Sequence, residues 1–428
     1  MTAPLLRTLT PAQLPTLGRA AVDTETLAAA ARIVDDVRQR GEPALRAQAE
    51  RLGDLRPGEA LVIPRAGLQA ALDGLAPAER AVLERTAERI RAFAAAQRAC
   101  LLPLTLALPG GAAGHVVAPV ASAGCYAPGG RFPLPSSVLM TVITARAAGV
   151  ETVWVASPRP AAVTLAAAAV AGADALLAVG GAQAIAALAY GAGPVPACDA
   201  VVGPGNRWVT AAKQLVAGQV AIDMLAGPSE LVVLADQTGD PALIAADLLA
   251  QAEHDDDALP VLVTTAPTLI DAVRGELVTQ LATLPTAATA RVALTHGFAV
   301  LVEDLVRGAA VCDQLAPEHL QLHVADAPAL AARLRHYGAL FIGARAAEVL
   351  GDYGAGPNHV LPTGGTARTT GGLSVLTFLR TRTWLRFDDE GGRELVADAV
   401  ALARLEGLEA HARAAARRLP DAAPRHRP

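Results

Sequence analysis

Hydrophobic positions recur along this chain with two periods, and the two periods alternate. Short apolar runs, typical of buried strands, are followed by segments in which apolar residues recur every three or four positions, typical of helices. The predicted strands of a first set are 115–120, 152–157, 175–179, 200–202 and 220–222, with helices at 136–148, 161–171, 182–190 and 208–216. A second set has strands at 230–235, 259–264, 299–302, 320–324 and 339–342, with helices at 241–254, 268–284, 304–314 and 327–337. This alternation predicts an α/β protein with two doubly wound, Rossmann-like modules, each a parallel sheet covered by helices.

The two ends of the chain lie outside this alternation. An N-terminal helical segment is predicted from 24–40 and 67–97, with a strand at 60–63, and we expect it to pack on the second module. An extended stretch at 374–387 and a long amphipathic helix at 391–418 form a C-terminal helical tail. The expected parts are therefore an arm at 1–20, one domain from 21–114 plus 229–373, a second domain at 115–228, and the tail at 374–428.

Composition excludes several classes of protein. With 428 residues, 52% of them hydrophobic and 18% charged, the chain can bury a large core. A net charge of -5 gives no reason to expect nucleic acid or an anionic membrane as a partner. The apolar run 163–195 is interrupted by Asp174 and Gln183, so buried α/β structure is favoured over a membrane span. Residues 1–19 contain no secretory signal, and the four scattered cysteines form no CxxC pair, so we expect a cytoplasmic protein without disulfides.

Gln251 and His254 end the predicted helix 241–254. They are three residues apart, so on a helix their side chains share one face. An amide oxygen and a neutral imidazole can both bind a divalent metal, but zinc usually takes at least three protein ligands. The remaining ligands must therefore come from elsewhere in the chain.

Glu318 and His319 follow a proline and precede a predicted strand. An adjacent carboxylate and imidazole can serve as two proton acceptors in one site. The alternative is that Glu318 caps a helix and His319 is incidental, and the spacing alone does not decide between them.

Other candidate polar residues lie in a glycine-rich loop and on the last helix. Asp352 and His359 fall in the loop 351–359, where Asp352 is either a metal ligand or a turn-forming residue. Glu406 and His411 lie on the predicted helix 391–418, where the alternative is an ordinary solvated face.

Three glycine-containing turns end strands of the first module. They are Tyr126–Gly130, Gly180–Gln183 and Gly203–Asn206. No G-x-G-x-x-G fingerprint is present, but three such turns at one sheet edge make a dinucleotide crevice a reasonable interpretation. Nucleophilic alternatives are weak, because Ser229 has no histidine near it in sequence and Cys125 and Cys312 have no neighbours that would lower a thiol pKa.

Seven segments together resemble the histidinol dehydrogenase family over nearly the whole chain. They are CYAPGGRFPLPSSVLM at 125–140, GGAQAIAALAYG at 180–191, VGPGN at 202–206, IDMLAGPSE at 222–230, LLAQAEHD at 248–255, APEHL at 316–320 and GDYGAGPNHVLPTGGTAR at 351–368. The chain departs from the usual pattern at Asp256 and at Gly371-Gly372, which are not candidate ligands.

The resemblance implies a role for each candidate residue. It implies one Zn²⁺ per subunit, held by residues that match Gln251, His254, Asp352 and His411. It makes Glu318 and His319 the proton acceptors. The positions matching substrate contacts are Ser229, His359 and Glu406, together with the zinc ligands and His319. The positions matching NAD⁺ contacts are Tyr126, Gln183 and Asn206.

The implied reaction is the last step of histidine biosynthesis, in which L-histidinol is oxidised through L-histidinal to L-histidine with two NAD⁺. The resemblance also implies a homodimer whose tail, with Glu406 and His411, reaches the partner's site. The 229–373 domain would then hold zinc, and the 115–228 domain would bind NAD⁺. Three alternatives stay open: a related zinc and NAD alcohol dehydrogenase acting on another small alcohol, a thiol-dependent aldehyde dehydrogenase using Cys125 or Cys312, and a non-catalytic metal-binding protein.

Overall fold

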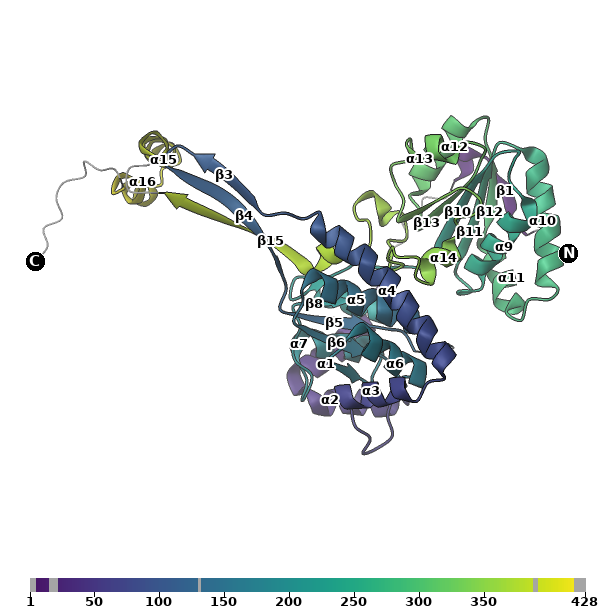
Figure 1. The fold of residues 1–428 in the computed structure, drawn as a ribbon, viewed down its shortest axis with the longest axis horizontal. Helices are drawn as coiled ribbons and strands as arrows, with labels where there is room; N and C mark the ends of the chain where they lie inside the picture. Colours follow the sequence, from purple (N-terminus) through teal and green to yellow (C-terminus); the bar gives the residue numbers. More distant parts are fainter. Residues whose placement is uncertain (1–4, 15–21, 130–131, 388–391, 419–428) are drawn as a thin grey trace, which may run out of the picture. The chain divides into compact units, whose positions relative to one another are not determined.

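The computed structural model describes residues 5–14, 22–129, 132–387 and 392–418. The chain divides into two compact units. The larger unit comprises Met1–Arg98 and Val120–Phe378, and the smaller unit comprises Ala99–Pro119 and Leu379–Pro428. The larger unit contains two six-stranded sheets, and the smaller unit contains one three-stranded sheet (Figure 1).

One sheet of the larger unit is built around β5 (Ser122–Tyr126). Its strand order is β2-β7-β6-β5-β8-β9, with β5 to β9 parallel and β2 antiparallel to β7. The other strands are β2 (Val62–Pro64), β6 (Thr152–Ala156), β7 (Ala175–Leu177), β8 (Ala200–Val202) and β9 (Ala221–Ile222). The connecting helices are α5 (Pro135–Ala148), α6 (Ala162–Ala171), α7 (Gly181–Tyr190) and α8 (Arg207–Val216). Strands and helices alternate here as the hydrophobic pattern predicts.

The other sheet of the larger unit is built around β10 (Glu230–Ala235). Its strands are all parallel, in the order β1-β12-β11-β10-β13-β14. The other strands are β1 (Arg7–Leu9), β11 (Leu259–Thr264), β12 (Phe298–Leu301), β13 (His319–His323) and β14 (Ala339–Ile342). The helices are α9 (Pro241–Ala252), α10 (Pro267–Leu281), α11 (Ala287–His296), α12 (Leu305–Leu315), α13 (Ala327–Ala331) and α14 (Glu348–Asp352).

Both sheets are doubly wound. In each, the strand that begins the alternation of strands and helices, β5 or β10, lies centrally, and the strand order reverses beside it, at β5/β8 and at β10/β13. Strands β2 and β1, which come earlier in the chain, lie at the sheet edges. Alternate residues of β10 enter two separate apolar cores, Leu231 and Val233 on the side of α9 and Val232 and Leu234 on the side of α12. The predicted fold class, two parallel-sheet modules, is confirmed.

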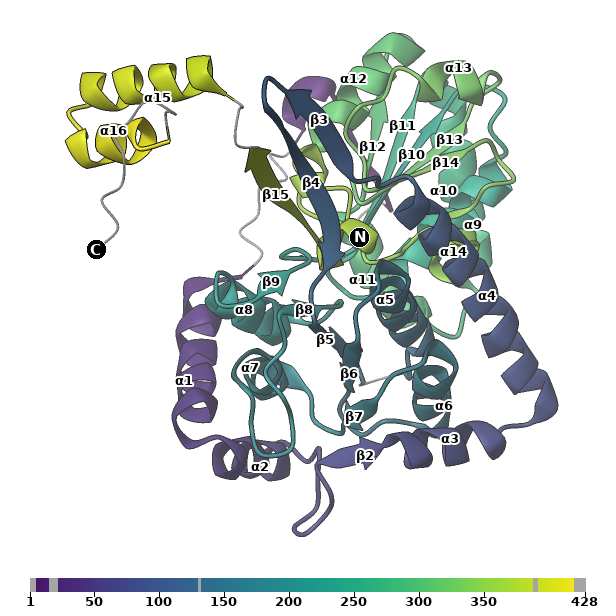
Figure 2. The same cartoon turned by 60° about the vertical axis from the view of Figure 1, so that its left-hand side comes forward.

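The N-terminal helical segment packs on the other module from the one expected. It contains α1 (Thr24–Arg40), α2 (Glu42–Arg51), α3 (Arg65–Asp73) and α4 (Pro77–Ala99). Strand β2 joins the sheet of β5, α1 packs against α7 and α8, and α3 packs against α6 (Figure 2). Grouping 21–114 with 229–373 was therefore wrong for β2 and for α1 to α3. Helix α4 is the exception, because the Arg89 guanidinium donates to the carbonyl of Gly354. Periodicity shows that a helix has an apolar face, but it does not show which sheet that face covers.

The predicted strand 115–120 also belongs elsewhere. It lies in the smaller unit as β4 (Gly111–Pro119), antiparallel to β3 (Leu104–Leu108) and β15 (Leu379–Phe387). The first strand of the module is instead β5, which the prediction missed because only Val120 and Ala121 separate it from β4. The smaller unit consequently contains residues 99–119 in addition to the tail.

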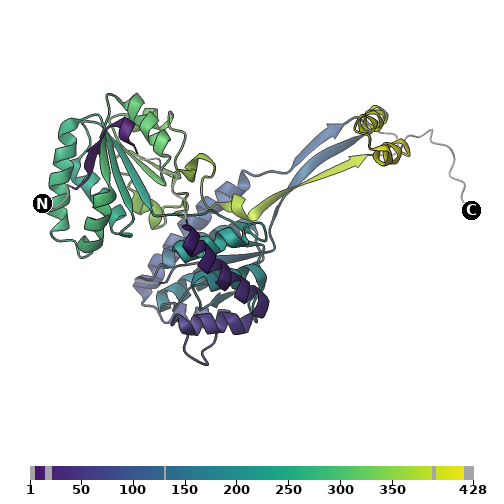
Figure 3. The ribbon, with the colours of Figure 1, turned by 180° about the vertical axis from the view of Figure 1, so that it is seen from behind.

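The predicted single helix 391–418 is two helices, α15 (Arg393–Leu405) and α16 (Glu409–Ala416). Gly407 lies between them with φ of +75°, a left-handed conformation that ends a helix at low cost only in glycine. The two helices pack against each other beyond the ends of the three-stranded sheet (Figures 1 and 3).

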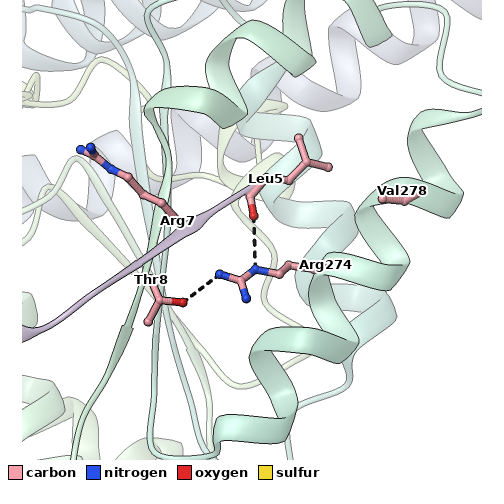
Figure 4. Close-up of a pocket in the computed structure, with 5 residues that line it drawn as sticks. All are labelled: Leu5, Arg7, Thr8, Arg274 and Val278. Carbon is pink, nitrogen blue, oxygen red and sulfur yellow. Dashed lines mark hydrogen bonds between the residues drawn. The ribbon is translucent and has the colours of Figure 1, made fainter. Parts of the chain in front are cut away.

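Part of the predicted arm is an ordered strand. Strand β1 pairs with β12, and the Arg274 guanidinium donates to the Leu5 carbonyl and to the Thr8 hydroxyl (Figure 4). The same guanidinium also donates to the Leu6 carbonyl. Parts of the arm (1–4 and 15–21) and the end of the tail (419–428) lie outside the described residues. No helix in the described part of the chain is long and apolar enough to cross a membrane.

Candidate functional site

Most of the candidate residues gather at the amino edge of the sheet of β10. Glu230 begins β10 and His319 begins β13, and the two strands pair so that Leu231 lies opposite His319. Helix α9 starts with Asp240 accepting a hydrogen bond from the amide of Ala242 and runs back along the sheet. Its far end therefore returns Gln251 and His254 to the edge where β10 and β13 begin, opposite to the carboxyl edge that doubly wound sheets usually use.

His319 has one ring nitrogen held and one free. Its Nδ1 lies 3.1 Å from the carbonyl oxygen of Glu230, which can only accept, so Nδ1 carries the proton. Its Nε2 is buried, has no hydrogen-bond partner in the described part of the chain and lies 3.6 Å from Asp352 Oδ1. In its neutral form the ring therefore presents a bare Nε2 that can accept a proton.

Glu318 is fixed beside His319. Its Oε2 accepts a 2.9 Å hydrogen bond from the amide of Glu230 and lies 3.7 Å from His319 Nδ1. Burial raises the pKa of the Glu318 carboxyl. Burial also raises the pKa of Glu230 to about 7, although its Oε1 accepts from the amide of Gly364 at 2.9 Å. The sequence interpretation in which His319 is incidental does not fit this arrangement.

His254, Glu348 and Asp352 form a group with metal-binding donors. One ligand atom of each lies within 4.8 Å of the others, and Asp352 Oδ2 lies 3.6 Å from His254 Nε2. Asp352 therefore stands between two imidazoles, because its other oxygen faces His319. This position favours a ligand role for Asp352 over that of a turn-forming residue.

Glu348 was missed by the sequence analysis. It is 1% exposed, and Oε1 lies 3.8 Å from His319 Nδ1. Neither carboxylate oxygen has a hydrogen-bond partner among the residues that the structure describes. Burial raises its pKa to about 7. The available signal was its spacing: Glu348 and Asp352 are four apart, which places both on one face of α14.

The residues present fit a divalent cation. Gln251 is fully buried, and neither its amide oxygen nor its nitrogen has a hydrogen-bond partner among the described residues. An unpaired buried amide is costly unless a ligand satisfies it. A Gln oxygen, an imidazole and carboxylates are donors that zinc accepts.

Electrostatics at the site also favour a cation. Desolvation would lower the pKa of His254, but its hydrogen bond to Asp352 and the charge of Glu348 raise the pKa to about 9. Desolvation would likewise lower the pKa of His319, but Glu348 and Glu318 raise it to about 10. The pKa of Asp352 is held well below its usual value despite burial, because the His254 and His319 imidazoles both lie beside its carboxylate. Four carboxyl groups, of Glu230, Glu318, Glu348 and Asp352, thus lie around the two imidazoles, and a bound cation would favour their ionised forms.

Ser229 and His359 flank this group. Ser229 directly precedes β10 and is half-buried. His359 Nδ1 lies 2.8 Å from the backbone oxygen of Asp352, and burial lowers the pKa of the ring. A neutral His359 held through Nδ1 offers Nε2 as an acceptor.

The predicted nucleotide contacts lie at the carboxyl edge of the other sheet. Tyr126, at the end of β5, accepts a 3.2 Å hydrogen bond from the amide of Gly181. Gln183 is 1% exposed, and its Nε2 has no hydrogen-bond partner within the described ranges. Asn206 caps α8 through its Oδ1, which accepts from the amides of Trp208 and Val209, so its amide NH₂ can still donate to a ligand.

The Gly203–Asn206 turn is held by a buried ion pair. Asp223 accepts from the amide of Gly203, and Lys213, which pairs with Asp223, donates to the Gly203 carbonyl. A Cβ at Gly203 would lie 2.0 Å from the Tyr126 carbonyl oxygen, and its φ is +120°. Only glycine fits there, which explains the close approach of this turn to the end of β5.

Comparison with known proteins places the chain in a family. A model of the family described as histidinol dehydrogenase matches residues 18–419. The chain is 43% identical over 396 residues to histidinol dehydrogenase of Pseudomonas syringae pv. tomato, covering 91% of this chain and 88% of that one. It is 47% identical over 392 residues to histidinol dehydrogenase of Cereibacter sphaeroides, covering 90% of each. The chain belongs to the histidinol dehydrogenase family.

A solved structure of the histidinol dehydrogenase family has the same fold. The crystal structure of histidinol dehydrogenase from Elizabethkingia anophelis is similar with a TM-score of 0.90 at 28% identity, over 97% of this chain and 98% of that chain. The resemblance found in the sequence motifs is therefore confirmed, including its extent over nearly the whole chain.

Two of the predicted site residues belong to the smaller unit. Glu406 follows α15, and His411 lies on α16, both with exposed side chains. Their assignment to the substrate and to zinc stays a prediction.

The thiol alternative has no support at either cysteine. Cys125 and Cys312 are fully buried, and burial raises the pKa of the Cys125 thiol to about 12 and that of Cys312 further. Thiols with pKa values this high stay protonated at neutral pH and are poor nucleophiles. Burial therefore argues against the thiol-dependent aldehyde dehydrogenase alternative.

Proposed function

We propose that this protein is a zinc-dependent histidinol dehydrogenase. L-Histidinol, two NAD⁺ and water would become L-histidine, two NADH and protons, with L-histidinal as the bound intermediate. The observation that carries this proposal is the pairing of His319 and Glu318, since one site then contains two separate proton acceptors. A single-step alcohol oxidation needs one acceptor, whereas oxidation through a hydrated aldehyde to an acid needs a second for water.

The metal would be held by Gln251, His254 and Asp352, with His411 of the tail as the fourth ligand. A zinc ion there would act as a Lewis acid and would orient the amino and imidazole groups of histidinol. The unpaired amide of Gln251 and the grouping of His254, Glu348 and Asp352 support this assignment.

His319 would act first. Its Nδ1 stays bonded to the Glu230 carbonyl, so its Nε2 takes the alcohol proton while hydride leaves the carbinol carbon for NAD⁺. Holding Nδ1 keeps the ring in one tautomer and one orientation, as the acceptor of a proton requires.

Glu318 would act next. As a buried carboxylate it would take a proton from water, which adds to the aldehyde carbon, and the hydrate then gives its hydride to a second NAD⁺. The bond from the Glu230 amide fixes one oxygen of Glu318 and leaves the other for water. Keeping the aldehyde bound between the two steps prevents loss of a reactive intermediate.

NAD⁺ would bind at the carboxyl edge of the sheet of β5. Tyr126, Gln183 and Asn206 lie at the ends of β5 and the starts of α7 and α8. The unpaired Nε2 of Gln183 and the amide NH₂ of Asn206 are donors that suit ribose and phosphate oxygens.

A homodimer would complete the site. The smaller unit exposes many leucines, namely Leu102, Leu104, Leu106, Leu385, Leu395, Leu402, Leu405 and Leu408. Leu405 is 84% exposed, adjacent to Glu406. Apolar side chains gathered in this way mark a protein interface more often than a free surface, which supports a tail that brings Glu406 and His411 to the partner's site. The enzyme would act in the cytoplasm on a small molecule, with neither nucleic acid nor membrane as a partner.

The test is an assay of the purified protein with L-histidinol and NAD⁺, following NADH with and without a chelator. NADH formation that stops on chelation and returns with Zn²⁺ supports the proposal. NADH formation that continues in metal-free protein, or formation with a simple aliphatic alcohol in place of histidinol, would overturn it.

A further inference from the structure

A stripe of polar side chains runs beneath α9, beyond the residues assigned to the reaction. Gln321 Nε2 lies 2.6 Å from Asp247 Oδ2 and 2.6 Å from His323 Nε2. Asp247 Oδ2 also lies 3.4 Å from His323 Nε2. Gln321 is 0% exposed and His323 is 2% exposed, so this Asp247–Gln321–His323 cluster is a buried network.

The cluster interrupts a face that is otherwise apolar. Residues 319, 321 and 323 of β13 alternate with Leu320 and Leu322, so they point to the α9 side of the sheet. On the neighbouring strand, their register partners on the same side are Leu231, Val233 and Ala235, all in the apolar core. One strand therefore presents three polar side chains where the adjacent strand presents three apolar ones.

This arrangement is costly as packing alone. Gln321 Oε1 and His323 Nδ1 are buried and have no hydrogen-bond partner among the described residues. Leucine and phenylalanine would fill the same space without desolvating polar atoms. Stability therefore does not account for the cluster. Directional hydrogen bonds can instead hold α9 and β13 in one relative position, whereas apolar contacts alone would allow the helix to shift along the strand.

The cluster links the two elements that carry the site. Asp247 is one helical turn before Gln251 and two turns before His254, on the same face of α9. Gln321 is two residues after His319, on the same face of β13. Helix α9 itself packs over β10 and β11. The Asp247–Gln321 hydrogen bond thus links α9, which carries the proposed metal ligand Gln251, to β13, which begins with the proposed proton acceptor His319.

We propose that Asp247, Gln321 and His323 are positioning residues that fix the axial and rotational setting of α9 against β13. They thereby set the distance between the zinc ligands Gln251 and His254 and the proton acceptors Glu318 and His319. The inference rests on the proposed function for the identity of the metal. Catalysis tolerates displacements of the reacting groups of well under an ångström. Hydrogen bonds that hold α9 against β13 should therefore affect turnover as well as metal affinity.

The test compares Gln321→Leu, which removes both bonds at similar volume, with Asp247→Asn, which keeps an acceptor for Gln321 Nε2. A second control, Leu322→Ala, creates a cavity on the opposite face of β13, where Leu322 is fully buried. Zn²⁺ affinity is measured by competition with a chelator, the absorption spectrum is recorded with Co²⁺, and kcat and KM are measured for both substrates.

Gln321→Leu is expected to weaken Zn²⁺ binding about tenfold or more and to change the Co²⁺ spectrum. Its kcat should fall about tenfold while KM for NAD⁺ stays within about twofold. Asp247→Asn should stay within about threefold of the unaltered protein in both measures. Leu322→Ala should lower Tm but leave Zn²⁺ affinity and the Co²⁺ spectrum unchanged. If Gln321→Leu does not fold, His323→Phe carries the same expectations.

Hydrogen exchange of the α9 amides adds a readout that needs no metal. Exchange at the last turn of α9 should be faster in Gln321→Leu than in Leu322→Ala when both are compared at equal loss of Tm. Equal exchange, or Zn²⁺ affinity and a Co²⁺ spectrum as in the unaltered protein, would overturn the inference. Failure of the unaltered protein to bind Zn²⁺ would instead contradict the proposed function, and the exchange comparison would still decide the positioning role.

Discussion

His319 Nδ1 lies 3.1 Å from the carbonyl oxygen of Glu230, the first residue of the neighbouring strand. The contact joins β13 to β10 at the edge of the sheet and fixes which ring nitrogen is bare. The backbone amide of Glu230 donates to Glu318. The backbone of one residue, Glu230, therefore positions both proposed proton acceptors. The roles of the two acceptors can therefore be separated by changing one without moving the other.

Glu318→Gln should divide the two half-reactions. Gln keeps an oxygen for the Glu230 amide but cannot take a proton from water, so oxidation of histidinal should fall about 100-fold or more. Oxidation of histidinol to histidinal should fall much less. His319→Asn is the matched variant, and it should slow the alcohol step. Both steps are followed by supplying either histidinol or histidinal. Equal loss of both steps in folded Glu318→Gln would remove the water-activating role.

His254→Ala should release the metal and keep the fold. The unaltered protein should carry about one zinc per chain, and the variant less than about a tenth of that. The fold should persist because the His254 side chain is 40% exposed and contributes little to the core. Zinc is measured by atomic absorption and folding by circular dichroism. The control is His296→Ala, which changes an exposed histidine at the end of α11 and should keep both zinc and activity. Stoichiometric zinc in His254→Ala would exclude this residue as a ligand.

Glu348→Gln should weaken binding of the amino alcohol. Both oxygens of Glu348 are buried and unpaired, so its charge is available to a cationic ligand in the site. Gln has the same shape without the charge, and we expect KM for histidinol to rise about tenfold, equivalent to about 1.4 kcal/mol. KM for NAD⁺ should not change. Glu303→Gln, at an exposed position, is the control. An unchanged KM for histidinol would show that Glu348 does not act on the substrate.

Mixing two inactive variants tests the tail. His319→Asn and His411→Ala homodimers each have two damaged sites. If the tail acts in the partner's site, a mixed dimer places both lesions in one site and leaves the other intact. Co-refolding the two variants should then restore about a quarter of the activity, since random pairing gives about half mixed dimers and each has one intact site. Mixed dimers that form without regaining activity would assign His411 to its own subunit.

The hydrophobic pattern was sufficient for the class of fold but not for every contact. It located nearly all the strands of both sheets, because buried parallel strands are short, apolar and separated by helices. It did not show that the helices of 24–73 pack on the module of β5, since an apolar face does not specify its partner. Nor did it separate β4 from β5, because the hydrophobic pattern changes little across the two residues that lie between these apolar strands.

The site was predictable to the extent that its residues lie in distinctive motifs. Gln251, His254, Glu318 and His319 lie at element ends, where polar residues next to apolar runs are visible. Glu348 was not found because a lone Glu in an Ala-rich helical run resembles any solvated position. The gathering of the site at the amino edge of the sheet depends on α9 returning along it, which becomes apparent only once the strands are paired.

The most direct test of the whole account is the yield of NADH from a limiting amount of L-histidinol. With excess NAD⁺ and zinc-loaded enzyme, each histidinol should give two NADH and one histidine, with no free aldehyde trapped by semicarbazide. Two NADH per histidinol is the result the paired acceptors Glu318 and His319 predict. One NADH per histidinol with trapped aldehyde, or no NADH at all, would contradict the account.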